Sequence, residues 1–167
     1  HNQYISLGAK YWQGVDAAKY RYITLVPGDN ELSKESLWDI LKHLGEADIL
    51  TTYTVNTEIR PLGRRMISRI FTFLINLSTG LNLRYYNGNC VHRTDIIKQI
   101  KDRDDSFAYM AKLLPLLIKA GHSYKEIPIH LQERGGGKPS ALKLANFVGV
   151  TKTIAGLFWK SRSREGR

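Results

Sequence analysis

The chain has 167 residues, 43% of them hydrophobic, which is enough apolar material for the core of one globular domain. Lysines and arginines outnumber acids by 25 to 15, a formal charge of +10, so an anionic partner is expected: nucleic acid, a phosphorylated small molecule or an acidic membrane. The single cysteine, Cys90, excludes a disulfide framework and a cysteine-based zinc site, and no apolar run approaches the roughly 20 residues that span a bilayer.

The chain opens with two predicted elements. Residues 6–19 place small and apolar side chains at a loosely helical spacing. Residues 23–26 are apolar or β-branched and are bounded by turn formers, which predicts a buried strand at the centre of a sheet. Pro27-Gly28 must end this strand, because proline has no ladder N–H and glycine permits a sharp reversal.

Two carboxylates follow that turn at once. Asp29 and Glu31 are thereby placed at the carboxyl edge of a strand, where open α/β sheets hold their ligands. Two acidic side chains there are able to hold a divalent cation, which would neutralise the phosphates of a substrate. The alternative is an ordinary strand-to-helix turn, with Asn30 or Ser33 as the helix cap and the acids at its positive end.

The next elements continue an alternation of helix and strand. Residues 33–43 form a predicted helix with Ser33 as its cap and an apolar stripe, and Gly45 closes it. Residues 47–52 form a second short strand. The order helix, strand, helix, strand indicates an α/β fold with a mostly parallel sheet and crossover helices.

A polar loop over residues 54–63 leads into the longest helical pattern, residues 63–77. On its first turns Arg64 and Ser68 project together, as do Arg65 and Arg69, because residues four apart share a helix face. Such a cluster at a helix start can bind a phosphate through charge-assisted hydrogen bonds. The alternative is a solvated cationic face on an amphipathic helix.

The second half of the chain predicts further helices and one strand. Asn87-Gly88 marks a hairpin or a loop that re-enters the sheet, and Pro115 predicts a kink or an early break in a helix. The strand is followed by a glycine-rich loop between Arg134 and Lys138, whose amides and charges suit a phosphate, although flanked glycine hinges are common. The elements themselves are helices over 95–100 and 106–120 and a strand over 127–131.

The last predicted element is an amphipathic helix within residues 140–159, with a basic tail from Lys160 to Arg164. An apolar stripe with cationic flanks is typical of a helix lying on an anionic membrane. The alternative is a C-terminal helix that packs on the core and leaves only the basic tail exposed. The stripe consists of Leu144, Phe147, Val148, Thr151, Ala155 and Phe158.

Taken in order, these features resemble the second half of a family-2 glycosyltransferase domain, of the branch containing dolichol-phosphate mannose synthase and bacterial polyprenyl-phosphate glycosyltransferases. Residues 2–18 are similar to the helix before the family's metal motif, and Ala47-Asp48-Ile49-Leu50 is similar to its Ala-Asp-Ile-Val strand. The other matches are Pro27 to Glu31 with Asp-x-Asp-x-Gln, Arg64 to Ser68 with Arg-x-x-x-Ser, Asn87-Gly88-Asn89 with Ser-Gly-Phe, and Glu126 to Ser140 with the closing Glu-Val-Pro-Ile…Arg-x-x-Gly-x-Ser-Lys.

The chain also departs from the family pattern. Pro27 replaces the first aspartate of the metal motif, so one metal ligand is lost. Thr54 stands where these enzymes often carry an arginine, Arg84 replaces an acidic residue, and Pro139-Ser140 replaces Ser-Lys. The first strands of the family's domain and its Asp-Asp-Gly-Ser segment have no counterpart, so we expect the chain to be a fragment.

The resemblance implies an α/β fold of the GT-A (Rossmann-like) type: a mixed, mostly parallel sheet with flanking helices, lacking the N-terminal nucleotide-binding strands and ending in an amphipathic helix. Residues 1–140 would form the partial catalytic domain, and residues 141–167 the membrane-interfacial helix with its basic tail. The chain would bind the cytoplasmic face of a membrane peripherally through this helix.

The activity implied by the resemblance is inverting transfer of a sugar from a nucleotide-diphosphate donor to a polyprenyl phosphate. Asp29 would be the catalytic metal ligand and Glu31 a second one, for Mg²⁺ or Mn²⁺. The residues that would hold substrate phosphates are Arg64, Arg65, Ser68, Arg134 and Lys138.

Two other classes of function remain open. Pro27 and the missing donor half suggest a catalytically inactive scaffold of the same fold. The charge and nine tyrosines suit a nucleic-acid-binding module, but no helix-turn-helix, RNP or zinc pattern is present, so no nucleic-acid partner is expected.

Overall fold

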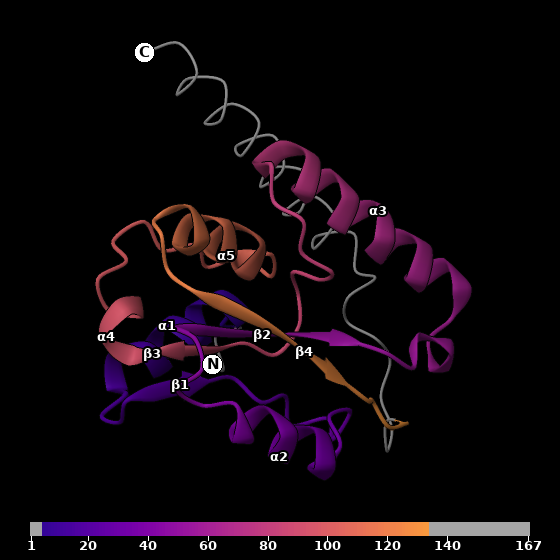
Figure 1. Ribbon diagram of the computed structural model, residues 1–167, viewed down its shortest axis with the longest axis horizontal. Helices are drawn as coiled ribbons and strands as arrows, with labels where there is room; N and C mark the ends of the chain where they lie inside the picture. The colour runs from indigo at the N-terminus through magenta and orange to yellow at the C-terminus, as the bar shows by residue number, and fades with distance from the viewer. Residues whose placement is uncertain (1–4, 134–167) are drawn as a thin grey trace.

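The computed structural model of the chain describes residues 5–133, which form a four-stranded sheet with helices on both faces (Figure 1). None of the helices in this range combines the length and the apolar character needed to cross a membrane. The elements in order are α1 (Leu7–Ala17), β1 (Tyr22–Thr24), α2 (Lys34–Lys42), β2 (Ile49–Thr54), the 3₁₀ turn η1 (Thr57–Ile59), α3 (Leu62–Thr79), β3 (Val91–Arg93), α4 (Thr94–Ile97), α5 (Tyr109–Lys119) and β4 (Tyr124–Ile129).

The strand order is β1-β3-β2-β4. β3 pairs antiparallel with both β1 and β2, whereas β2 and β4 are parallel. β1, β2 and β4 therefore run in one direction and only β3 runs in the other. This confirms the expected mixed sheet, in which two of the three strand pairings are antiparallel, and it places the carboxyl ends of three strands at the same edge.

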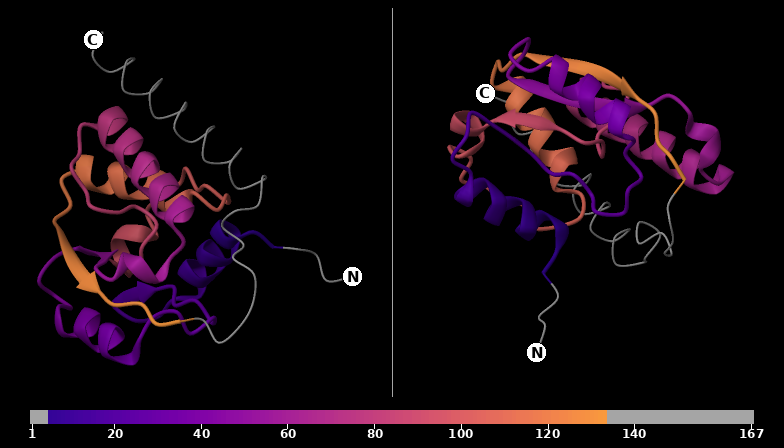
Figure 2. Two further views of the ribbon diagram at one scale, coloured as in Figure 1. Left: turned by 90° about the vertical axis from the view of Figure 1, so that its right-hand side faces the viewer. Right: turned by 90° about the horizontal axis from the view of Figure 1, so that it is seen from below.

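The sheet separates two apolar clusters because successive side chains of a strand point to opposite faces. Ile49 of β2 faces a larger cluster built with α1, α3, α4 and α5, while the next residue, Leu50, faces a smaller cluster built with Ile40 of α2. Figure 2 shows α2 on one side of the sheet and α3 with α5 on the other.

The helix caps follow from the sequence. The Ser6 hydroxyl accepts a hydrogen bond from the Ala9 amide at the start of α1, and Ser33 accepts one from the Ser36 amide at the start of α2. Each cap satisfies one of the amide groups that a first helical turn leaves without an intrahelical partner.

Three expectations about elements were wrong in part. β1 is half-buried at an edge of the described sheet and ends at Thr24, because β3 is its one partner there and covers only residues 22–24. α5 starts at Tyr109 and continues through Pro115 without an early break, held by a buried apolar face on both sides of the proline. β4 starts at Tyr124, three residues before the predicted strand, because it pairs with β2 along its full length.

The expected helix within residues 140–159 lies outside the described residues, as does the basic tail.

The 81–90 loop re-enters the sheet as β3 and packs directly on β2. A Cβ atom added to Gly88 would lie 2.2 Å from the carbonyl oxygen of Thr52, closer than any van der Waals contact allows. The Asn89 side-chain amide also donates to the Leu25 carbonyl oxygen at 3.1 Å. The loop is thus fixed between β2 and the segment that follows β1.

Replacing Gly88 by alanine should therefore destabilise the protein. We expect a loss of about 2 kcal/mol in the free energy of unfolding, typical of an overpacked site, measured by urea denaturation. Gly63→Ala in α3 is the matched control, since its new Cβ would meet no atom within 4 Å and alanine favours a helix. Equal stability of the two variants would contradict the close approach.

His92 of β3 is a buried histidine on the larger cluster. Its Nδ1 lies 3.0 Å from the Tyr11 hydroxyl oxygen, and its Nε2 has no hydrogen-bond partner among the described residues. Burial lowers the pKa of His92 from 6.5 to about 4. The imidazole is therefore neutral at pH 7, which agrees with a structural role.

This burial predicts a loss of stability with falling pH. The unfolded chain binds a proton at His92 near pH 6.5 and the folded chain only near pH 4. The stability that the neutral, buried imidazole provides is therefore complete above pH 6.5 and is lost as the pH falls towards 4. Between pH 7.5 and pH 5 we expect a loss of about 2 kcal/mol, measured by urea denaturation. His92→Gln should remove that part of the pH dependence, and an unchanged profile in the variant would show that other groups cause it.

Candidate functional site

The candidate site lies where the carboxyl ends of β1, β2 and β4 meet. The segments that follow these strands are bonded to one another: Leu32 forms a β-bridge with Leu131, and the Gln132 amide donates to the Glu31 carbonyl oxygen at 2.9 Å. The Asn56 side chain bonds both backbone groups of Leu131, at 2.7 and 2.9 Å. This edge of the sheet is therefore a fixed frame, as expected for the ligand-binding edge of an α/β sheet.

Glu31 is the acidic centre of this frame. Its Oε1 accepts from Arg60 Nη2 at 2.8 Å and Nε at 3.2 Å, and Arg64 Nη2 lies 3.9 Å away. The side chains of Glu31 and Arg60 are only 13% and 14% exposed, so water screens this pair less than a surface pair. Although burial disfavours the charged guanidinium, Tyr85 and Glu31 together raise the pKa of Arg60 above its ordinary value.

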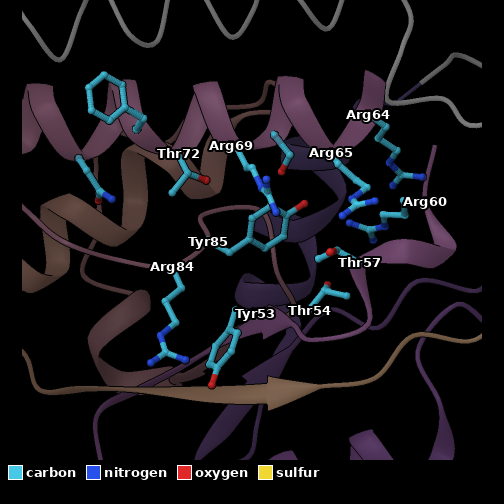
Figure 3. Close-up of a pocket in the computed structure, with 13 residues that line it drawn as sticks. Tyr53, Thr54, Thr57, Arg60, Arg64, Arg65, Arg69, Thr72, Arg84 and Tyr85 are labelled. Carbon is cyan, nitrogen blue, oxygen red and sulfur yellow. The ribbon is translucent and has the colours of Figure 1, made fainter. Parts of the chain in front are cut away.

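Beside this ion pair is a pocket of about 360 Å³ between α3 and the end of β2. Figure 3 shows Arg60, Arg64 and Arg65 gathered at one end, Arg84 beside Tyr53 at the other, and Arg69 with Tyr85 between them. The lining residues are Tyr53, Thr54, Thr57, Arg60, Arg64, Arg65, Ser68, Arg69, Thr72, Phe73, Asn76, Arg84 and Tyr85.

α3 supplies most of this wall because of its helical period. Phe71 and Ile75 are buried in the core cluster, which fixes the rotation of the helix about its axis. Positions four apart share a face, so Arg64 and Ser68 enter the pocket together, and so do Arg65 and Arg69. Because one face of α3 packs on the core, the neighbouring face points four polar side chains into the pocket.

Arg65 carries the observation that points to an anionic ligand. Its Nε is buried and has no hydrogen-bond partner among residues 5–133. In the same range no carboxylate lies within ion-pair distance of Arg65, Arg69 or Arg84. A buried guanidinium N–H normally has an acceptor, so this arrangement is suited to a phosphate or carboxylate supplied by a ligand.

The other end of the pocket is formed by a stacked pair. The guanidinium carbon of Arg84 lies 4.4 Å from the centre of the Tyr53 ring, a cation–π contact. The backbone amide of Arg84 donates to Glu126 Oε1 at 2.7 Å, which ties this residue to β4. Tyr53 is the second-last residue of β2, so the strand itself positions the stack.

Asp29 lies on the turn after β1 and is not among the residues that line this pocket. Its Oδ1 accepts a hydrogen bond from the Glu31 amide at 3.2 Å, and Asn30 between them has a left-handed backbone with φ of 56°. In residues 5–133 no three histidine, cysteine, aspartate or glutamate side chains are grouped so as to hold a metal ion. Asp29 offers one carboxylate that fits a hard cation, while the carboxylate of Glu31 binds arginines.

The structure brings together four of the seven predicted site residues. Arg64, Arg65 and Ser68 line one pocket, and Glu31 forms an ion pair with Arg64, a contact that local sequence did not indicate. Arg134 and Lys138 lie outside the described residues. Sequence reasoning missed the role of Arg60, and it noted Thr54 and Arg84 only as departures from the family, although both line the pocket.

The structure is similar to solved structures of glucosyl-3-phosphoglycerate synthase from Mycobacterium tuberculosis. The TM-score is 0.68 for its complex with Mg²⁺ and UDP, at 10% identity over 94% of this chain. It is 0.65 for the complex with Mn²⁺, UDP-glucose and phosphoglyceric acid, at 10% identity over 95% of this chain. The fold is GT-A. A mycobacterial protein with a TM-score of 0.65 is 15% identical over 94% of this chain.

This chain spans 56%, 56% and 53% of those three chains, or about half their length. No family model matches the sequence, and no curated protein matches it. At such low identities the likeness establishes the fold alone. Evidence for a function therefore comes from the arginine pocket.

The pocket should bind diphosphate. We expect Arg65→Gln to weaken pyrophosphate binding at least about tenfold, the effect of losing a charge-assisted hydrogen bond of roughly 1.5–3 kcal/mol, measured by isothermal titration calorimetry. Arg21→Gln is the matched control, because Arg21 lies over the Tyr22 ring, outside the pocket. The same loss in both variants would mean that pyrophosphate responds only to the net charge.

Proposed function

We propose that this protein transfers a sugar from a nucleotide-diphosphate donor to the phosphate of an acceptor, as the GT-A fold and the arginine pocket together suggest. The observation that carries the proposal is the buried Nε of Arg65, which has no hydrogen-bond partner among the described residues and belongs to a pocket lined by five arginines. Its position at the carboxyl ends of parallel strands is where this class of sheet binds ligands.

The two ends of the pocket suit different parts of the substrates. Arg64, Arg65 and Ser68 would hold the acceptor phosphate or the departing diphosphate through charge-assisted hydrogen bonds. Arg60, held by Glu31, would fix the position of this cluster. Arg84 on Tyr53 would offer a second cation at the opposite end.

The donor diphosphate of such a reaction is commonly accompanied by a divalent ion, and the compared synthase structures contain Mg²⁺ or Mn²⁺. In this chain Asp29 would supply a carboxylate ligand, with diphosphate oxygens and water as the others. When bound, the ion would stabilise negative charge on the leaving diphosphate.

The reaction needs no strong general base. An acceptor phosphate is already largely dianionic near pH 7, so one of its oxygens can attack the anomeric carbon directly. The new C–O bond forms on the face opposite the bond to the diphosphate, which breaks with its electron pair and inverts the configuration. The arginines would stabilise the charge on both phosphoryl groups throughout.

For the acceptor we propose a polyprenyl phosphate, with the protein bound peripherally at the cytoplasmic face of a membrane. The net charge of +10 favours an anionic lipid surface. Arg134 and Lys138 would add charge beside the same acceptor phosphate.

A soluble phosphorylated acid is the second candidate acceptor. The compared synthase was solved with phosphoglyceric acid, and cations at both ends of this pocket suit a small molecule with two anionic groups. The two acceptors differ in whether an apolar chain is required.

The test is sugar transfer from a panel of nucleotide sugars, with Mn²⁺, to a short polyprenyl phosphate and to phosphoglyceric acid. It should use this chain and any longer natural chain that contains it. We expect transfer to the lipid phosphate, lost in Asp29→Ala and retained in Asp39→Ala, whose carboxylate pairs with Lys42 on the exposed side of α2.

Transfer to phosphoglyceric acid alone would replace the proposed acceptor with the soluble one. No transfer by either chain, together with no manganese binding that depends on Asp29, would contradict the enzyme and favour the inactive scaffold. A salt-sensitive shift of DNA or RNA that persists without residues 162–167 would favour the nucleic-acid module.

A further inference from the structure

α3 exposes a row of apolar side chains along its whole length. The spacing of four, four, three and four residues places them on one helix face, roughly opposite Phe71 and Ile75, which are buried. A single exposed apolar residue is ordinary, but a row over an entire helix normally marks a contact surface. Its members and their exposed fractions are Leu62 (71%), Met66 (62%), Ile70 (55%), Phe73 (63%) and Leu77 (62%).

The described part of the chain ends beside the start of this row. Leu131 is held to Asn56, immediately before η1 and α3, and Gln132 is held to Glu31. Figure 1 shows the end of β4 and the start of α3 on the same side of the molecule. Residues beyond Glu133 therefore start close to the amino end of α3.

The sequence beyond this point has a segment of matching size and pattern. Residues 141–159, if helical, would be about 28 Å long, and the 18 residues of α3 are about 27 Å long. Residues 134–140 can span up to about 25 Å, enough to reach either end of the row from its start. The apolar stripe of this segment, Leu144 to Phe158, also extends over nearly its full length.

We propose that residues 141–159 bind as a helix along the exposed row of α3, stripe against row. The segment would then pack on the domain and would not lie on a membrane. It leaves the basic tail to face an anionic surface. The proposal does not depend on the reaction.

The test is disulfide cross-linking within the full chain, in a Cys90→Ser background because Cys90 is a free thiol. Ile70 is near the middle of α3 and Thr151 near the middle of the segment, so they meet whichever way the helix runs. Thr153 projects from the opposite face and is the matched control, since both changes are threonine to cysteine.

We expect Ile70→Cys with Thr151→Cys to form an intramolecular disulfide at least about ten times faster than with Thr153→Cys, since the bond needs Cα atoms within about 7 Å. Adding Phe147→Asp should abolish this difference by placing a charge in the apolar contact. Circular dichroism of each variant verifies that it is folded.

Three results would overturn the proposal. Equal rates for the two cysteine positions would mean that the stripe does not face α3. Disulfides formed only between chains would assign the row to a second copy. Absence of any cross-link, with Ile70→Cys protected from maleimide only by vesicles of anionic phospholipid, would assign the row to a membrane.

Discussion

Among the described residues, the arrangement of the site depends on one carboxylate, that of Glu31, beside several guanidinium groups. Like charges about 4 Å apart repel by roughly 4 kcal/mol near a protein surface, so the arginines of the pocket would not gather without compensation. Glu31 supplies this compensation for Arg60 and Arg64. Its backbone also bonds Gln132 and Asp29, so this one residue connects the segments that follow β1, β2 and β4. Within residues 5–133 the other arginines of the pocket have no carboxylate partner, so their charge is available for a ligand.

α3 shows how one helix can serve three purposes. Phe71 and Ile75 anchor it in the core, Arg65 faces the pocket about a quarter-turn away, and Met66 and Ile70 form part of the exposed row. Any change that rotates the helix would therefore disturb the pocket and the row together. The closeness of these faces connects substrate binding to whatever covers the row.

Local sequence predicted what depends on neighbours along the chain. The Ser33 cap, the helical period that pairs Arg64 with Ser68, and the strand before Asp29 are all within a few residues of their cause. It did not predict that Glu31 binds Arg60, which is 29 positions away, or that β3 lies between β1 and β2. Arg84 and Tyr53 likewise meet only because β2 and the 81–90 loop pack together. Such contacts depend on tertiary pairing, for which the local pattern contains no signal.

The charge of the pocket has a consequence for how quickly a ligand arrives. A cleft lined by one sign of charge focuses its field and accelerates the encounter with anions. At physiological ionic strength the screening length is about 8 Å, so this field reaches little beyond the pocket mouth. Attraction in the cell would therefore act mainly on molecules already close to this surface, and capture from a surface-bound pool would be favoured over capture from bulk solution.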